Sequence, residues 1–354
     1  MKSDSSKFFL IVSLVLLLLN LPVFSQSGDG FNFQINKNHV DSLLVNEILS
    51  EAEDIENLYS LLLSIKNEIV MESYFHGSVK GELNNTQSVT KSIIALLIGK
   101  AIDDGYILNE QDNISKYFAI YDSLVGMIST DNLLQMTGGF NWDENKDFIP
   151  WLTSTSQVNY ILSKGSGSIP GSEFKYNSGA AHLLSVIIER ASGIATNIYA
   201  IKNLFDPVGS DTISWPTDAE GYAHGSTGLE MRPADMIKIG VLLLNKGRWE
   251  GKPVIQADWC DKIFLPQNYV GKKWGDLENI KYGYLWWKAE LQGHDICFAW
   301  GYAGQFIFLL PQLDAVIVTT SKWRVDPNQA ASTEESIIEL LSDYIIPFIE
   351  SRID

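Results

Sequence analysis

A serine and a lysine stand three residues apart at Ser88-Val89-Thr90-Lys91, at the head of the apolar run SIIALLIGKAI. On a helix, residues i and i+3 share a face, so the two side chains would point the same way. A serine hydroxyl is a weak nucleophile unless a base stands beside it. Lysine is such a base only when neutral, and both burial and the positive end of the helix dipole disfavour its charged form. The spacing therefore indicates a nucleophile and its base.

The S-x-x-K pattern alone leaves a second interpretation open. Lys91 could extend to solvent, with Ser88 acting only as a helix cap. A second match, Ser172-Glu173-Phe174-Lys175, lies in a Pro-Gly loop with no helix directly after it. The helix that follows Ser88 therefore favours the first match.

A tyrosine and a serine form the next candidate pair. Tyr176 follows a loop and precedes a predicted helix, and its phenol can move a proton if neighbouring cations lower its pKa. Ser178 lies two residues on, which is the same side of an extended segment. Taken alone, the tyrosine could equally be an anchor for the loop.

Two glycines flank Tyr302-Ala303 in the third candidate, Gly301-Tyr302-Ala303-Gly304. Glycine in or beside a strand often marks the close approach of a ligand to the backbone. A strand N–H from 302–304 would then pair with the Ser88 N–H as an oxyanion hole. An ordinary bulge or turn is the other interpretation.

The elements that must position these residues follow from the hydrophobic patterns. Residues 59–77 predict a hairpin, with Lys66-Asn67-Glu68 between two β-rich runs. The other predicted helices are 179–201 with Gly193 interrupting it, 233–247, and 334–349. The other predicted strands are 282–288, 294–299, 304–311 and 314–320. This order predicts an α+β fold: an antiparallel sheet from N- and C-terminal segments, flanked by helices, with a mostly helical lobe at roughly 103–245 inserted.

Composition limits the classes of function. The chain has 354 residues, of which 45% are hydrophobic, so a substantial core is expected. A net charge of −17 argues against nucleic-acid partners, which need a basic face. The histidines are scattered and no HExxH or CxxC motif occurs, so neither a metal site nor a cofactor is predicted. Cys260 and Cys297 could form one disulfide, but two buried free thiols are the preferred interpretation.

The N-terminus has the pattern of a secretory signal peptide over residues 1–25. Lys2 and Lys7 precede an apolar run at 8–24, with cleavage expected after Ser25. That run is shorter than the ~20 residues of a membrane-spanning helix, so no stable span is predicted for the mature chain. We therefore expect a secreted or periplasmic protein, with a flexible polar segment at 26–40 and a single domain at 41–350.

In this order, the three motifs resemble those of the serine β-lactamase and penicillin-binding-protein superfamily. The chain is most similar to the class C-like group, which includes esterases and 6-aminohexanoate-dimer hydrolase. The resemblance extends from about Asn57 to Phe348 and includes 132-NLLQMTGGFNWDE-144. It implies a β-lactamase-like fold in which Ser88 is the acylated nucleophile, Lys91 its base partner and Tyr176 the tyrosine of a Y-x-N motif. Gly301 and its neighbours take the place of the K-T-G strand.

Two positions depart from the family pattern. Ser178 stands where Y-x-N has its asparagine, a pattern that resembles the amide and ester hydrolases of the group. Ala299-Trp300-Gly301 stands where K-T-G would lie, so the cation that helps hold the substrate carboxylate in penicillin-recognising relatives is missing. The glutamate that serves deacylation in class A enzymes has no clear counterpart.

The expected function is that of a secreted serine hydrolase that cleaves a small ester, amide or short peptide through an acyl-enzyme on Ser88. Lys91 takes the serine proton, Tyr176 serves the leaving group, and backbone N–H groups of Ser88 and 302–304 hold the oxyanion. One alternative is a β-lactamase or DD-peptidase. The other is an inactive binding or sensor protein on the same fold.

Overall fold

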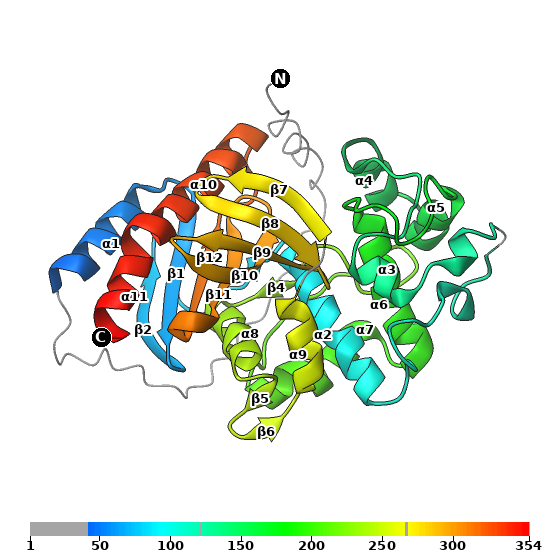
Figure 1. The fold of residues 1–354 in the computed structure, drawn as a ribbon, viewed down its shortest axis with the longest axis horizontal. Coiled ribbons are helices and arrows are strands. Elements are labelled where there is room, and N and C mark those ends of the chain that lie inside the picture. The colour runs from blue at the N-terminus through cyan, green and yellow to red at the C-terminus, as the bar shows by residue number, and fades with distance from the viewer. Residues whose placement is uncertain (1–41, 121, 266–267, 354) are drawn as a thin grey trace.

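The computed structural model describes residues 42–120, 122–265 and 268–353 (Figure 1). The predicted signal peptide and the segment 26–40 lie outside the described residues. Within the described part, no helix is both long enough and apolar enough to cross a membrane.

One antiparallel sheet of eight strands forms the centre of the larger lobe, in the order β2-β1-β12-β11-β10-β9-β8-β7. The N-terminal hairpin therefore pairs with the last strand of the chain, and Leu61 lies opposite Thr319. The strands are β1 (Leu58–Ile65), β2 (Glu68–Tyr74), β7 (Asn268–Trp274), β8 (Leu277–Gly283), β9 (Trp286–Leu291), β10 (His294–Gly301), β11 (Gln305–Leu310) and β12 (Ala315–Ser321). Two-residue pairs join β3 (Asn84–Asn85) to β4 (Glu230–Met231) and β5 (Arg248–Trp249) to β6 (Lys252–Pro253).

Helices cover the sheet and build a second lobe beside it (Figure 1). In Figure 1, α1 (Ser42–Asp54), α10 (Pro327–Leu340) and α11 (Ile346–Ile353) lie on one side of the sheet. On the other side, α8 (Pro233–Leu244) packs on β1, β11 and β12. The remaining helices are α2 (Val89–Asp103), α3 (Thr130–Leu134), α4 (Glu144–Leu152), α5 (Gln157–Ser163), α6 (Ser178–Ser192), α7 (Thr196–Ala200) and α9 (Ala257–Phe264). The predicted α+β architecture, with its sheet drawn from both ends of the chain, is confirmed.

The helix α2 is buried on nearly all sides, as its uniformly apolar sequence predicts. It packs against β10 and β11 of the sheet and against α6 of the helical lobe. A Cβ at Gly99 would lie 2.4 Å from the Trp259 ring, and the Trp259 indole N–H donates to the Ala95 carbonyl at 2.9 Å. Glycine therefore allows α9 to lie directly on α2, the helix whose N-cap residue is Ser88.

One predicted strand is wrong. Residues 282–288 do not form a strand but span the end of β8, a two-residue turn and the start of β9. Tyr284 and Leu285 both have positive φ values, 51° and 60°, which two-residue hairpins require and which usually select glycine or asparagine. Contacts with distant residues support the turn here: the Leu285 N–H donates to the Leu134 carbonyl, and the Tyr284 hydroxyl donates to Asp131.

The helix boundaries are also refined. The predicted helix 179–201 is α6, which is capped by Gly193 in the left-handed conformation, followed by α7 and a short π-helix at Ile201–Phe205. The predicted helix 334–349 begins earlier, at Pro327, because Asp326 caps the N–H groups of Asn328 and Gln329. Cys260 and Cys297 are buried and free, in agreement with the preferred interpretation.

Candidate active site

Ser88 and Lys91 are in contact, as the helical spacing predicts. Lys91 Nζ lies 2.9 Å from Ser88 Oγ. Ser88 is the N-cap of α2 and is half-buried, whereas the lysine side chain is buried with 1% exposure. The residue before Ser88, Gln87, has a φ of +50°, and such strained backbone is often found at functional sites. The alternative in which Lys91 reaches solvent is wrong.

Burial changes the proton affinity of Lys91. Desolvation lowers its pKa from 10.5 to about 8, and the charge of Glu144 opposes this shift. An ordinary lysine is almost fully protonated at neutral pH, whereas here roughly a tenth of the molecules carry a neutral amine at pH 7. Lys91 can therefore accept a proton from the serine hydroxyl at physiological pH.

Tyr176 joins this pair from the other lobe. Its ring centroid lies 5.0 Å from Lys91 Nζ, and its hydroxyl shares a hydrogen bond with Ser88. Cations do not lower its pKa: burial, followed by the charge of Glu144, raises the pKa of Tyr176, and the bond to Ser88 opposes this only in part. Tyr176 is therefore a neutral phenol that can donate a proton. Its ring stacks on Trp287 with centroids 6.2 Å apart.

Ser178 lines the same cavity as Ser88, but its hydroxyl is hydrogen-bonded to Glu144. It is the first residue of α6, with 1% exposure, rather than part of an extended segment. Its hydroxyl donates to Glu144 Oε1, and its backbone N–H donates to Glu144 Oε2 at 3.0 Å. The Trp142 indole N–H also donates to Glu144, at 2.7 Å.

Glu144 is a site residue that the sequence motifs did not identify. It begins α4 and faces Ser178 across 34 positions of sequence. The only signal for it was its place at the end of the family-like segment 132–144. In space it is a carboxylate in the wall of the cavity, close enough to influence both Lys91 and Tyr176 electrostatically.

The segment 302–304 is a turn rather than the strand expected for the oxyanion hole. β10 ends at Gly301 and β11 begins at Gln305, while Ala303 and Gly304 have φ values of +65° and +93°. The Ala303 N–H donates to Glu334 Oε1 at 2.7 Å, and the Gly304 N–H also bonds this carboxyl. Both N–H groups are therefore turned away from Ser88 by Glu334, which corrects the expectation for these two residues. Tyr302 lines the cavity.

Gly301 has the close backbone approach expected of it, but the neighbour is the chain itself. A Cβ at Gly301 would lie 2.2 Å from the Thr86 carbonyl oxygen and 3.0 Å from Gln87 Cβ. The end of β10 can therefore lie directly on the segment that leads into Ser88. This contact brings two segments that are far apart in the sequence, one at Thr86 and one at Gly301, into one site.

Glu334 is the second carboxyl that sequence reasoning missed. It projects from α10, has 1% exposure and also accepts the Trp300 indole N–H at 3.1 Å. Burial raises its pKa to about 8, although its hydrogen bonds oppose the shift. The residue that stands where K-T-G has its lysine is the buried Ala299, and the next residue, Trp300, is bonded to a carboxyl.

A cavity of about 350 Å³ opens beside Ser88 and contains these groups. Its apolar wall includes Phe148, Phe174 and Trp300, and Lys175 is the one basic side chain among its described lining residues. Phe148 thus lines the cavity, whereas four other aromatic residues near it in the sequence or in the helical lobe are packed in the core: Phe140, Trp142, Trp151 and Trp215. In the described ranges, no three His, Cys, Asp or Glu side chains are grouped to hold a metal.

Fold and site together define the class. A buried lysine beside a serine at a helix start, with a tyrosine completing the cluster at the junction of a sheet lobe and a helical lobe, is the arrangement of serine β-lactamase-like hydrolases. The model of the Beta-lactamase family matches residues 60–341, so the chain belongs to this family.

The chain is also similar to individual hydrolases. The 6-aminohexanoate-dimer hydrolase of Paenarthrobacter ureafaciens is 23% identical over 282 residues, which cover 73% of this chain and 70% of the relative. A Bacillus anthracis structure, provisionally named as a 6-aminohexanoate-dimer hydrolase, has a TM-score of 0.73 at 20% identity and covers 86% of this chain and 82% of its own. The D-amino acid amidase of Ochrobactrum anthropi SV3 has a TM-score of 0.66 at 13% identity, with coverages of 88% and 99%. The protein is a β-lactamase-fold hydrolase related to amide hydrolases.

Proposed function

We propose that this protein is a serine hydrolase that cleaves small amides or esters through a covalent acyl-enzyme on Ser88. The observation that carries the proposal is the 2.9 Å contact between Ser88 Oγ and the buried Lys91 amine, whose pKa is about 8. A base of this pKa and position is what a serine nucleophile needs.

The proposed reaction has two halves. In the first, neutral Lys91 takes the Ser88 proton while the hydroxyl oxygen attacks the substrate carbonyl, and the Ser88 N–H at the start of α2 stabilises the oxyanion. The neutral phenol of Tyr176 then gives a proton to the departing amine or alcohol. In the second half, water attacks the acyl-enzyme and gives a proton to the Tyr176 phenolate left by the first half, while protonated Lys91 returns its proton to the Ser88 oxygen as the acyl group leaves.

The cavity supports amides and esters over β-lactams. A β-lactam carries a carboxylate that the K-T-G cation helps to hold in penicillin-recognising relatives, yet here the K-T-G segment presents Trp300 bonded to Glu334, and the one basic side chain among the described lining residues, Lys175, comes from a different segment. The names of two relatives, a 6-aminohexanoate-dimer hydrolase and a D-amino acid amidase, support hydrolysis of small non-β-lactam substrates. High kcat/KM for a chromogenic cephalosporin would overturn this choice of substrate.

Labelling with a fluorophosphonate tests the nucleophile. Wild-type protein should be labelled stoichiometrically and Ser88→Ala should not, with peptide mapping placing the adduct on Ser88. Equal labelling of both would refute the assignment. A wild type that neither labels nor turns over short-chain esters, amides and D-amino-acid peptides would favour the inactive binding protein instead.

Export is a separate proposal. The pattern of residues 1–25 supports removal of a signal peptide and a secreted or periplasmic location. N-terminal sequencing of the protein from its native host should give a start at Gln26. An intact Met1 in the mature protein would refute it.

A further inference from the structure

Lys91 has a second hydrogen-bond partner besides Ser88. Its Nζ donates to the carbonyl of Ser226 at 2.8 Å, from a residue 135 positions along the chain. Ser226 is fully buried and follows Gly225 in the segment that leads to β4. The direction of the lysine amine therefore depends on where this segment places one peptide carbonyl.

The segment before Ser226 is attached to α6. The Gly225 N–H donates to His182 Nδ1 at 3.1 Å, and the Ser185 hydroxyl donates to the Ala223 carbonyl at 2.7 Å. A Cβ at Gly225 would lie 2.7 Å from the Ala181 carbonyl oxygen, so only glycine allows this approach. The Gly225 N–H is therefore held against the His182 imidazole.

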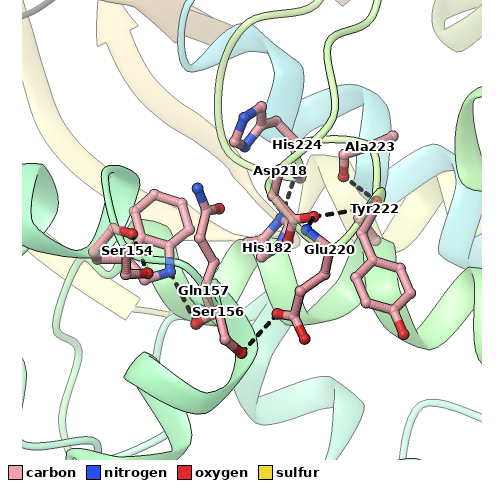
Figure 2. A network of polar contacts seen from close by, with 12 residues as sticks. Ser154, Ser156, Gln157, His182, Asp218, Glu220, Tyr222, Ala223 and His224 are labelled. Atoms are coloured by element: carbon pink, nitrogen blue, oxygen red, sulfur yellow. Dashed lines mark hydrogen bonds and ion pairs between the residues drawn. The ribbon is translucent and has the colours of Figure 1, made fainter.

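This contact is possible in one tautomer of His182. Since Nδ1 accepts the Gly225 N–H, it carries no proton, and the neutral ring must carry its proton on Nε2. Nε2 lies 3.0 Å from Asp218 Oδ2 and therefore donates to it. Both side chains are fully buried, and Figure 2 shows Asp218 between the imidazole and the turn that follows.

The second oxygen of Asp218 is also occupied. Asp218 Oδ1 accepts the backbone N–H groups of Glu220 and Tyr222, each at 2.9 Å (Figure 2). Burial alone would raise the pKa of Asp218, but the bond from His182 and these N–H groups outweigh it and lower the pKa. The carboxylate thus offers His182 only an acceptor. The nearby ring of His224, 5.8 Å away, stays neutral because burial lowers its pKa to about 4.

We propose that His182 and Asp218 are positioning residues for the acyl transfer proposed above, and the inference rests on that function. Asp218 selects the Nε2–H tautomer of His182, His182 then holds the Gly225 N–H, and the adjoining Ser226 carbonyl directs the Lys91 amine at Ser88. Neither residue is among the described residues that line the cavity beside Ser88.

Asp218→Asn tests the first link with almost no change of shape. The two N–H groups of Glu220 and Tyr222 would hold the amide oxygen, so the amide NH2 would face His182 Nε2. The ring would then carry its proton on Nδ1, against the Gly225 N–H. We expect the acylation rate of Ser88 to fall between about ten- and a hundredfold, the scale of a small displacement of a catalytic group.

Two substitutions of His182 separate its two contacts. In His182→Asn the amide oxygen takes the position of Nδ1 and can still accept from Gly225, whereas in His182→Gln the amide nitrogen takes the position of Nε2 and can reach only Asp218. We expect the asparagine variant to acylate faster than the glutamine variant. Asp112→Asn is the matched control, because Asp112 is another buried aspartate that braces a loop but does not line the cavity.

The rate constant of fluorophosphonate labelling is measured separately from probe binding, with folded protein quantified by circular dichroism. Nitrogen-15 spectra of labelled histidine report the tautomer of His182. The proposal is overturned if the tautomer changes in Asp218→Asn while acylation stays at the wild-type rate. It is also overturned if the two His182 variants lose activity equally and in proportion to their loss of folded protein.

A failure of the proposed function gives a different result from a failure of this inference. If the wild-type protein is not labelled, the acyl-transfer assignment is refuted, and the NMR titration of Lys91 then tests whether His182 and Asp218 position the lysine. Asp218→Asn should then lower the Lys91 pKa, because the ammonium loses its carbonyl acceptor, and Asp112→Asn should not. An unchanged titration in Asp218→Asn overturns the inference. If Asp218→Asn does not fold, the His182 pair carries the comparison.

Discussion

Replacing Lys91 with methionine should abolish acylation and should also remove a pH-dependent destabilisation of the folded protein. Methionine has a similar length and no charge, so it suits the buried site. It cannot accept the Ser88 proton, and we expect the acylation rate to fall by about two to four orders of magnitude. The informative quantity is the difference in the free energy of unfolding between variant and wild type as pH changes.

The size of that difference follows from the Lys91 pKa. The group titrates at 10.5 in its ordinary environment and at about 8 in the folded protein. Between these values the unfolded chain binds more protons than the folded one, so wild-type stability rises with pH. The lowered pKa of Lys91 reduces the free energy of unfolding by about 3 kcal/mol at pH 7. About 2 kcal/mol of this destabilisation is absent at pH 9.5. The unpaired Ser226 carbonyl in the variant costs about 1–3 kcal/mol at either pH, so it cancels from the comparison.

Urea unfolding at pH 7 and pH 9.5, with reversibility verified at each, measures the effect. The stability of Lys91→Met relative to wild type should decline by about 2 kcal/mol over this interval. Lys100→Met is the matched control, because it deletes a partly exposed, ion-paired lysine of the same helix. A difference that stays constant between the two pH values would refute burial as the source of the reactivity of Lys91.

Three further predictions concern the carboxyls and the glycine of the site. Glu144→Gln should move the acidic limb of the pH profile of kcat/KM to lower pH, because the carboxylate raises the pKa of Lys91; an unmoved limb would argue against their coupling. Glu334→Gln should retain the wild-type kcat/KM at pH 7, where a carboxyl of pKa about 8 is mostly protonated. Above pH 8 the wild-type carboxyl ionises and glutamine does not, so the kcat/KM of the variant should progressively exceed that of wild type; parallel pH profiles would contradict this. Gly301→Ala should lose both activity and about 1–3 kcal/mol of stability, because its Cβ would lie 2.2 Å from the Thr86 oxygen; thermal melts and labelling at wild-type levels would show the contact to be relaxed.

The nucleophile and base could be predicted from the sequence because their relation is local. Ser88 and Lys91 are three residues apart at the start of a helix, and helical geometry alone places them on one face. The all-apolar run after them likewise predicted the burial of Lys91, which the structure confirms at 1% exposure. Tyr176 required more, since its spacing carried no geometric information and only the order of family motifs selected it.

The two carboxyl groups of the site could not be predicted from the sequence. Glu144 meets Ser178 across the helical lobe, and Glu334 meets Ala303 across the gap between α10 and the β10–β11 turn. Glutamate is common on surfaces, so neither position stands out in a single sequence. The histidines looked scattered, yet the fold places the rings of His182 and His224 within 5.8 Å of each other.

The 282–288 error has the same origin. Tyr284-Leu285 contains none of the residues that signal a two-residue turn, and the aromatic run YGYLWWK favours a strand by propensity. The turn exists because Leu134, Asp131 and Ser92, all from other elements, bond its backbone and side chains.

By itself, the sequence determined the α+β architecture, the buried helix and the contact between Ser88 and Lys91. These depend on hydrophobic periodicity and on interactions within one helical turn. The tertiary structure alone decided which carboxyls surround the site, which backbone N–H groups face Glu334 rather than Ser88, and which carbonyl directs the lysine. Those features arise where elements distant in sequence pack together, and packing depends on shape and contact rather than on spacing along the chain.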